Sequence, residues 1–133
     1  MALQGSLDTS AIIRLLTNDI PRERQAVADL LESLDGQCAV ADIAITEAVF
    51  VLGCEYGYTR EEIALSLRAF MLQPKINCNR VMFDRAFDLF ASHPPISFED
   101  CCLVVYAELD NASPLYTFDK KLAGQLKSVV LVS

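Results

Sequence analysis

The sequence predicts an α/β fold, a three-layer α/β/α sandwich around a mainly parallel central sheet. Short apolar segments alternate along the chain with longer segments in which apolar residues recur at helical spacing. This alternation is typical of strands connected by helices, which then cover both faces of a parallel sheet. The chain has 133 residues, the length of one ordinary domain, and no linker, repeat or low-complexity segment divides it. We therefore expect residues 1–133 to form a single domain.

The first part of the chain predicts two strands and four helices. Pro21 suits the first turn of a helix, where its missing N–H would have no partner. The segment Thr59-Arg60-Glu61-Glu62 has the pattern of a capping box. In chain order we expect a strand at Ala2–Leu7, a short helix containing Ile12, Ile13, Leu15 and Leu16, a helix from Pro21 that Gly36 ends, a strand at Cys38–Val40, a helix from about Asp42 to Gly57, and a helix from Thr59 to Pro74.

The second part predicts three helices and two late strands. His93-Pro94-Pro95 interrupts any helix, and Ser97 is a suitable N-cap for the apolar segment that follows it. The lone His93 is interpreted as a loop residue, because no second histidine accompanies it. We expect a helix at about Arg80–Ser92, a helix after Ser97, a strand at Leu115–Thr117, a short helix around Lys120–Leu126, and a strand at Val129–Val132.

The composition excludes several classes of protein. A hydrophobic fraction of 53% with 22% charged residues indicates a compact globular chain. Asp42 and Glu47 interrupt the longest apolar segment, so no membrane span is expected, and the N-terminus lacks the features of a signal peptide. Cytoplasmic residence is the expectation. The five cysteines form an odd set without C-x-x-C spacing, which favours reduced core thiols over a zinc site or a disulfide framework.

Four acidic residues stand inside or at the edge of apolar segments: Asp8, Glu47, Asp100 and Asp119. A buried, isolated carboxylate is costly and normally loses its charge or gains a partner. Four carboxylates from distant parts of one chain suggest a shared divalent cation. Asp8 and Asp119 both follow predicted strands, whose carboxyl ends meet at one edge of a parallel sheet. We therefore expect these two acids at the same edge.

Helix capping is an alternative role for three of these acids. Asp8 and Asp119 stand where an N-cap would accept backbone N–H groups, and Asp100 is three residues after Ser97. Glu47 does not fit this alternative, because it lies in the middle of a predicted helix. Its same-face neighbours are apolar, and no lysine or arginine occurs between residues 42 and 57. A surface position for Glu47, on a helix turned by one register, is the remaining alternative.

Hydroxyl side chains accompany three of the acids: Thr9 and Ser10 follow Asp8, Thr46 precedes Glu47, and Thr117 shortly precedes Asp119. Carboxylates, hydroxyls and water are the ligands of hard cations, so the pattern predicts Mg²⁺ or Mn²⁺. The net charge of −7 is unusual for a protein that binds nucleic acid by charge alone. Bound cations are not counted in that charge, which therefore leaves a nucleic-acid partner open.

Four segments carry a resemblance to a known family: LDTSAIIRLLTND, ITEAVFVLGCEYGYTREEI, SFEDCCLVVYAE and PLYTFDKKL. In order and spacing they resemble the motifs of PIN-domain ribonucleases, and above all the VapC-type toxins of toxin–antitoxin pairs. The resemblance runs from Leu7 to Leu122 and includes all four acids. Ala41 departs from the family pattern, because a serine is common at that position.

The resemblance implies a metal-dependent endoribonuclease that hydrolyses RNA phosphodiester bonds. It implies Asp8 and Asp100 as the principal ligands of Mg²⁺ or Mn²⁺, Asp119 as a direct or water-mediated ligand, and Glu47 as a ligand or a general base. Thr9, Ser10 and Thr117 would support these ligands or contact substrate. A protein antitoxin and a homodimer are also implied. An RNA-processing nuclease of the same fold, without an antitoxin, is the alternative within the family.

Other classes fit less well. A receiver-like phosphoacceptor needs adjacent acids after the first strand, but Thr9 follows Asp8. A haloacid-dehalogenase phosphatase needs D-x-D, but Ser10 occupies the third position. A non-enzymatic binding module would bind no metal and would tolerate loss of the acids. Arg14, Lys120 and Lys121 are candidate phosphate contacts, although a solvated surface position is the simpler interpretation.

Overall fold

The computed structural model describes residues 2–132, and these form two compact units, residues 2–79 and residues 80–132. Both units combine helices with wholly parallel strand pairs. Among residues 2–132, no helix is both long enough and apolar enough to cross a membrane.

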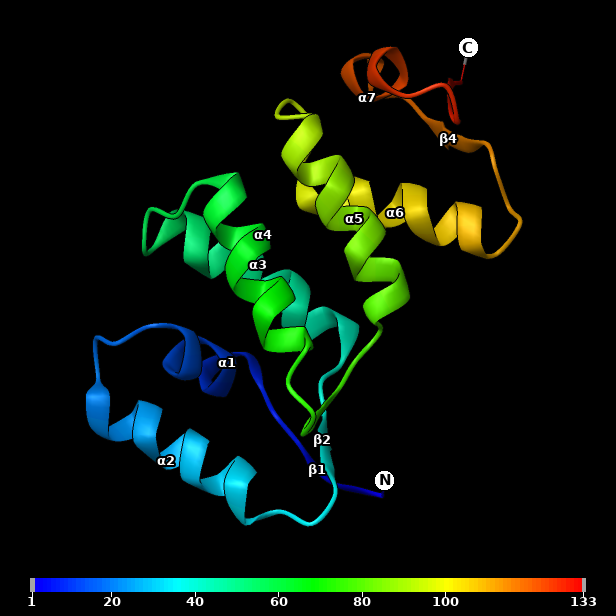
Figure 1. Cartoon of the computed structure of the whole chain (residues 1–133). Helices are drawn as coiled ribbons and strands as arrows, with labels where there is room; N and C mark the ends of the chain where they lie inside the picture. Colours follow the sequence, from blue (N-terminus) through cyan, green and yellow to red (C-terminus); the bar gives the residue numbers. More distant parts are fainter. Residues whose placement is uncertain (1, 133) are drawn as a thin grey trace. The chain divides into compact units, whose positions relative to one another are not determined.

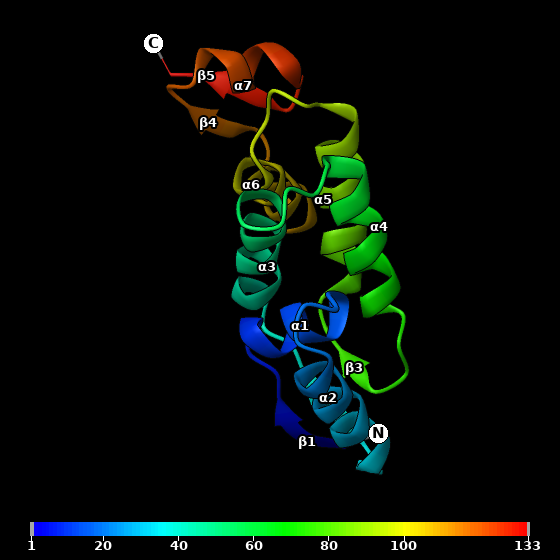
Figure 2. The ribbon, with the colours of Figure 1, turned by 90° about the vertical axis from the view of Figure 1, so that its left-hand side faces the viewer.

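The first unit contains a three-stranded parallel sheet in the order β1-β2-β3. Gly5 of β1 pairs with Cys38 of β2, and Cys38 pairs with Ile76 of β3. Its elements are β1 (Leu3–Ser6), α1 (Thr9–Leu16), α2 (Pro21–Ser33), β2 (Gln37–Ala39), α3 (Asp42–Cys54), α4 (Arg60–Met71) and β3 (Ile76–Asn77). Helix α1 packs against both α2 and α3 (Figures 1 and 2).

The second unit pairs two helices and adds a small parallel sheet at the C-terminal end. Its elements are α5 (Arg80–Ser92), α6 (Phe98–Leu109), β4 (Leu115–Thr117), α7 (Lys120–Gln125) and β5 (Val129–Leu131). Tyr116 of β4 pairs with Val130 of β5, and α7 connects the two strands. Figure 2 shows α7 beside this strand pair.

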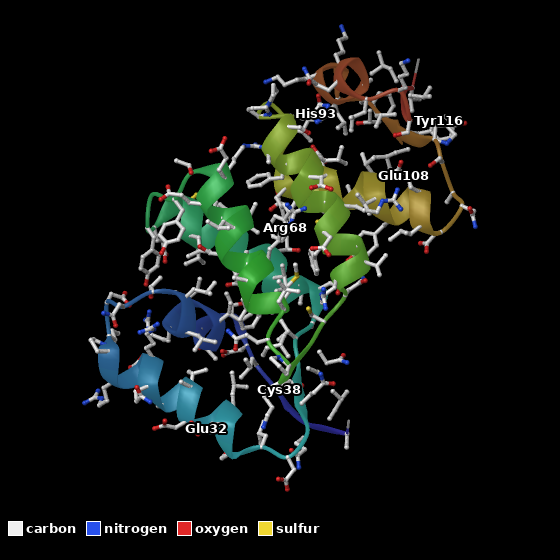
Figure 3. All side chains as sticks on the ribbon, in the orientation of Figure 1. Glu32, Cys38, Arg68, His93, Glu108 and Tyr116 are labelled. Atoms are coloured by element: carbon white, nitrogen blue, oxygen red, sulfur yellow. The ribbon has the colours of Figure 1, made fainter. Side chains whose placement is uncertain are left out.

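Aromatic residues join the two helices of the second unit. Phe98, at the start of α6, stacks on Phe87 of α5 with ring centroids 4.8 Å apart. It also meets Phe90 edge-on, with centroids 5.3 Å apart. Arg85 and Glu108 connect the same helices by an ion pair of 3.2 Å (Figure 3 labels Glu108). Apolar burial and ring packing therefore fix α5 against α6.

The element predictions are mostly confirmed, with three corrections in the first unit. Gly36 does not end α2, which stops at Ser33. Instead, a Cβ at Gly36 would lie 2.1 Å from the carbonyl oxygen of Ala2, so glycine permits this close approach. Helix α3 ends at Cys54, three residues before the predicted end. Strand β3 has only two residues and was not predicted.

The thiol prediction is confirmed for Cys38, Cys101 and Cys102, which are buried. Cys54 is exposed at the end of α3, so its thiol is not part of a core. His93 follows the end of α5 directly, as the loop prediction required.

Candidate active site

Asp8 begins α1 as its N-cap residue. Its backbone is extended, with φ −89° and ψ 177°, and its Oδ1 accepts hydrogen bonds from the amide of Ala11 at 3.0 Å and the hydroxyl of Ser10 at 2.7 Å. These two hydrogen bonds lower the pKa of Asp8, and the Ser10 bond contributes most. Asp8 is therefore held as a carboxylate at the start of a helix, where the helix dipole also favours negative charge.

Glu47 lies in the middle of α3 and faces the start of α1. Its Oε2 accepts a hydrogen bond of 3.2 Å from the hydroxyl of Thr9, the residue after Asp8. Its neighbours Ile43 and Phe50 are 78% and 60% exposed, so this face of α3 is open to solvent. The buried position inferred for Glu47 from the sequence is therefore wrong and the surface alternative holds, because α3 packs through its other faces.

The same correction applies to the other acids. Asp8, Glu47 and Asp119 are exposed, and Asp100 is half-buried. The sequence places them beside apolar residues, but adjacent residues in a helix or loop point in different directions. Desolvation is therefore not what makes these carboxylates unusual. Asp8 and Asp119 are distinguished instead by the backbone amides that their carboxylates accept.

Asp100 occupies the third position of α6. Its amide donates to the hydroxyl of Ser97, the N-cap, at 3.2 Å. Within residues 2–132 its carboxylate accepts no hydrogen bond. In the complete capping box of α4, by contrast, the carboxylate of Glu62 accepts the amide of Thr59 at 2.9 Å. Aspartate is one methylene shorter than glutamate, and here it leaves the reciprocal capping bond unmade.

Asp119 is the N-cap residue of α7. Its Oδ1 accepts both the amide of Lys121 at 2.9 Å and the amide of Leu122 at 3.1 Å. Its own amide donates to the hydroxyl of Thr117 at 3.0 Å. Thr117 therefore fixes the backbone that presents Asp119. The capping alternative is confirmed for both Asp8 and Asp119, and in each case the hydrogen bonds converge on one carboxylate oxygen.

The structure brings only some of the predicted residues into contact: Thr9 bonds Glu47, Ser10 bonds Asp8, and Thr117 bonds the amide of Asp119. Asp8, Thr9, Ser10 and Glu47 belong to the first unit, whereas Asp100, Thr117 and Asp119 belong to the second. Within residues 2–132, neither unit by itself gathers three or more acidic, histidine or cysteine side chains that could hold a metal ion. The shared site of the four acids therefore stays a prediction.

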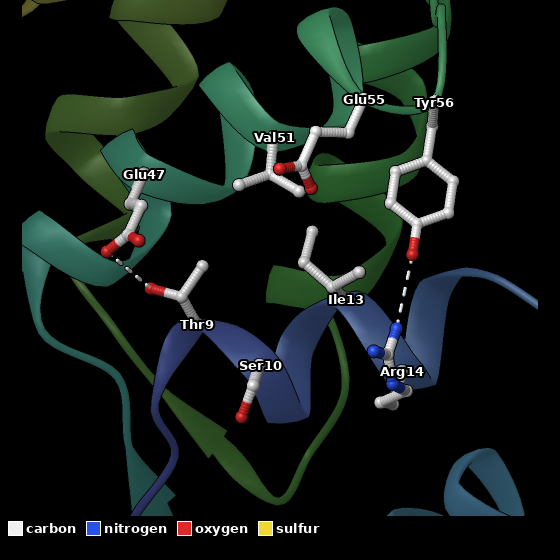
Figure 4. Close-up of a pocket in the computed structure, with 8 residues that line it drawn as sticks. All are labelled: Thr9, Ser10, Ile13, Arg14, Glu47, Val51, Glu55 and Tyr56. Carbon is white, nitrogen blue, oxygen red and sulfur yellow. Dashed lines mark hydrogen bonds between the residues drawn. The ribbon is translucent and has the colours of Figure 1, made fainter. Parts of the chain in front are cut away.

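A groove of about 280 Å³ lies between α1 and α3 in the first unit. It is lined by Thr9, Ser10, Ile13, Arg14, Glu47, Val51, Glu55 and Tyr56 (Figure 4). Four of these lining residues were not predicted from the sequence: Ile13, Val51, Glu55 and Tyr56. Val51 and Glu55 could have been found from their spacing with Glu47, which places all three along one helix face.

Arg14 closes one end of this groove and is engaged in a network of hydrogen bonds. Its Nε donates to Glu23 at 2.8 Å, and its Nη1 donates to the hydroxyl of Tyr56 at 3.1 Å. The Tyr56 hydroxyl in turn donates to Asp19 at 2.7 Å. The pKa of Arg14 is raised, first by Tyr56 and then by Glu23. Arg14 is thus a partly exposed residue, with 27% of its side chain exposed, whose guanidinium is tied to Glu23 and Tyr56.

The residues present suit a hard cation. Asp8, Glu47, Asp100 and Asp119 offer only oxygen atoms, and hydroxyls accompany three of them. Capping occupies one oxygen of Asp8 and one of Asp119, so it is compatible with coordination by the second oxygen. An all-oxygen set excludes a preference for soft metals and fits Mg²⁺ or Mn²⁺.

Comparison with known proteins supplies the family. The model of the PIN domain family matches residues 6–124, so the chain belongs to that family. This membership confirms the predicted fold class, an α/β/α architecture with a mainly parallel sheet. A similar solved structure is Mycobacterium tuberculosis VapC20, described as a sarcin–ricin loop cleaving toxin. It is 14% identical, the match covers 91% of this chain and 94% of VapC20, and the TM-score is 0.44. No curated protein matches the chain.

Proposed function

We propose that this chain is a Mg²⁺- or Mn²⁺-dependent endoribonuclease, the toxin of a toxin–antitoxin pair. The observation that carries the proposal is the Thr9–Glu47 hydrogen bond, which sets the second acid of the PIN pattern beside the helix start that Asp8 caps. Family membership and the presence of all four acids support the same conclusion. We further propose that residues 1–133 act as one domain.

The residues divide the work as follows. Asp8 and Asp100 hold the cation, Asp119 adds a direct or water-mediated ligand, and Glu47 either binds the cation or takes the proton of the attacking water. When bound there, the cation would supply a water of lowered pKa and would offset charge on the scissile phosphate. Ser10 and Thr9 orient Asp8 and Glu47 by hydrogen bonds, and Thr117 orients the backbone of Asp119.

The proposed partners are RNA, a protein antitoxin and a second copy of the chain, in the cytoplasm. The net charge of −7 suits a basic antitoxin. Exposed apolar side chains on α3 and α4, such as Phe50 and Leu65, offer it apolar contacts.

The direct test is cleavage of RNA by the purified chain. We expect cleavage with Mg²⁺ or Mn²⁺, none in EDTA, and none by Asp8→Asn. Asp35→Asn, at an exposed position outside the four acids, is the matched control and should cleave normally. Cleavage that persists undiminished in EDTA would contradict the proposal.

The toxin role has a separate test in cells. Expression of the wild-type chain should slow growth of the host, and Asp8→Asn or Asp100→Asn should relieve the effect at equal protein levels. Growth inhibition by the Asn variants as strong as by wild type would assign the toxicity to another cause.

A further inference from the structure

The groove between α1 and α3 extends from the candidate active site to the Arg14–Tyr56 hydrogen bond (Figure 4). The Thr9–Glu47 hydrogen bond marks its other end. Between the two ends, Ile13 supplies a buried apolar floor. The groove therefore leads away from Asp8 and Glu47, the two candidate site acids of the first unit.

Hydrogen bonds and a ring contact hold the far end of the groove. The Tyr56 hydroxyl accepts a hydrogen bond from Arg14 and donates one to Asp19, so its polar capacity is used. Tyr58 meets the Tyr56 ring edge-on, with centroids 6.4 Å apart. The ring of Tyr56 is consequently held in place, and it lines the groove as an aromatic surface.

The charges of the groove do not suit a phosphate. Glu47 and Glu55 both line it, and the positive charge of Arg14 is offset by Glu23 at 2.8 Å and Asp19 at 3.5 Å. A phosphate group in this groove would therefore be repelled, whereas an uncharged ring system could enter. The volume of about 280 Å³ lies near the lower limit of small-molecule sites, which suits one ring system.

We propose that this groove binds one unstacked RNA base next to the cleaved phosphodiester, and that it prefers guanine. The inference rests on the proposed nuclease function. Ile13 and Val51 contact the face of the base, the ring of Tyr56 closes the end of the slot, and the carboxylate of Glu55 accepts from its edge. Bases in single-stranded RNA are commonly recognised by stacking on side chains and by hydrogen bonds to their edges. Among the four RNA bases, only guanine has adjacent N1–H and N2–H donors, which can both bond to one carboxylate.

The test separates base recognition from catalysis. Guanosine, which has no phosphate, is titrated into the protein in EDTA while the methyl NMR signals of Ile13 and Val51 are followed. We expect saturable shifts, with weaker binding of adenosine, cytidine and uridine. Glu55→Gln should weaken guanosine binding by about tenfold, the loss expected for one bidentate contact. Glu32→Gln, on α2 and outside the groove (Figure 3), should bind as wild type does.

Cleavage provides the second measurement. Short RNAs that differ only in the base beside a single cleavable bond should be cut fastest with guanine there, and Glu55→Gln should remove this preference while metal-dependent cleavage continues. Equal shifts with all four nucleosides, or none, would overturn the base site even if RNA is cleaved. Methyl shifts caused by arginine amide and not by guanosine would also overturn it, because the groove would then be a cation site. Failure to cleave any RNA contradicts the nuclease proposal separately.

Discussion

The Thr9 hydroxyl lies 3.2 Å from Oε2 of Glu47 and 3.5 Å from the carbonyl oxygen of Ala44, so one side chain joins the start of α1 to two positions of α3. Thr9 directly follows Asp8, the N-cap of α1. Its contacts therefore fix the distance between the helix start that presents Asp8 and the helix that presents Glu47. This connection suggests a positioning role for Thr9.

Replacing Thr9 by valine keeps its shape and removes the hydroxyl. Because Glu47 would lose its hydrogen-bond donor from α1, we expect RNA cleavage to fall by about 10–100-fold, the range for residues that orient ligands. Thr9→Ser restores the hydroxyl and should restore most of the activity. Initial cleavage rates of the three proteins at saturating Mn²⁺ measure this. Equal rates for Thr9→Val and Thr9→Ser would remove the proposed role of the hydroxyl.

The Arg14–Tyr56–Asp19 network predicts a pH-dependent stability. The pKa of Asp19 is lowered, first by the Tyr56 hydroxyl and then by the Thr17 hydroxyl. A carboxylate whose pKa is lower in the folded state stabilises the fold above its unfolded pKa, and this contribution is lost as the pH falls through the folded value. The relevant window is therefore acidic, below the ordinary aspartate pKa of 3.8. The raised pKa of Arg14 has the opposite sign and acts only at strongly alkaline pH.

Tyr56→Phe should therefore lower the melting temperature near neutral pH, and the difference from wild type should narrow below pH 4. Tyr58→Phe is the matched control, because the Tyr58 hydroxyl makes no hydrogen bond in the part of the chain that the structure describes. Its effect should be small and independent of pH. Melts across an acidic pH series measure both variants, and a Tyr56→Phe difference that is constant down to the lowest pH would contradict the coupling to Asp19.

Replacing Gly36 by alanine should lower the stability of the fold, whereas replacing Gly124 by alanine should raise it. The new Cβ at position 36 would lie 2.1 Å from the carbonyl oxygen of Ala2, so the backbone must move. We expect Gly36→Ala to lower the free energy of unfolding by about 1–3 kcal/mol, as overpacking does. Gly124 is inside α7 with open space around it, and Gly124→Ala should raise stability by up to about 1 kcal/mol. Chemical denaturation measures both, and unchanged stability of Gly36→Ala would contradict the close approach.

Local signals explain why most elements were predictable from the sequence. The Thr59 capping box and the Ser97 N-cap begin α4 and α6 as predicted, because capping depends on neighbouring residues alone. Strand β3 could not be found this way. It consists of Ile76–Asn77, and its strand character comes from pairing with β2, a partner distant in the sequence.

The candidate site, like the fold, was only partly predictable from the sequence. Asp8, Thr9 and Glu47 were identified from sequence, and the structure brings them to one place. The exposure of Asp8 was not foreseen, and that of Glu47 was only an alternative, because the sequence shows which residues are adjacent but not which helix faces pack. Tyr56 was missed for a related reason. It follows the end of α3, and its contact with Arg14 spans more than forty positions of the chain.

Substitution of Asp100 can distinguish a metal-binding role of this residue from a helix-capping role. In the apo protein, carboxylates that share a site repel one another, and this repulsion lowers stability when all are ionised. Asp100→Asn removes one of these charges and nearly keeps the shape of the side chain. It breaks no side-chain hydrogen bond within residues 2–132, because the carboxylate of Asp100 accepts none. We therefore expect the apo variant to melt at a higher temperature than wild type near neutral pH.

Glu99→Gln is the matched control for Asp100→Asn. Glu99 stands in the same first turn of α6 and is exposed. Both substitutions remove one negative charge from the positive end of the helix dipole, at a cost of about 0.3–1 kcal/mol. If Asp100 serves only this helix, both variants should be destabilised alike. A higher melting temperature for Asp100→Asn alone would therefore arise from repulsion outside α6.

The melting temperatures are also compared with and without metal, because a ligand that binds only the folded state stabilises it by mass action. Adding Mn²⁺ to millimolar concentration should raise the melting temperature of wild type and of Glu99→Gln, and that of Asp100→Asn much less. Thermal melts of the three proteins, with EDTA and with Mn²⁺, measure all of these differences. An Asp100→Asn variant that is destabilised like Glu99→Gln, and that gains as much from Mn²⁺ as wild type, would show that Asp100 is not a metal ligand.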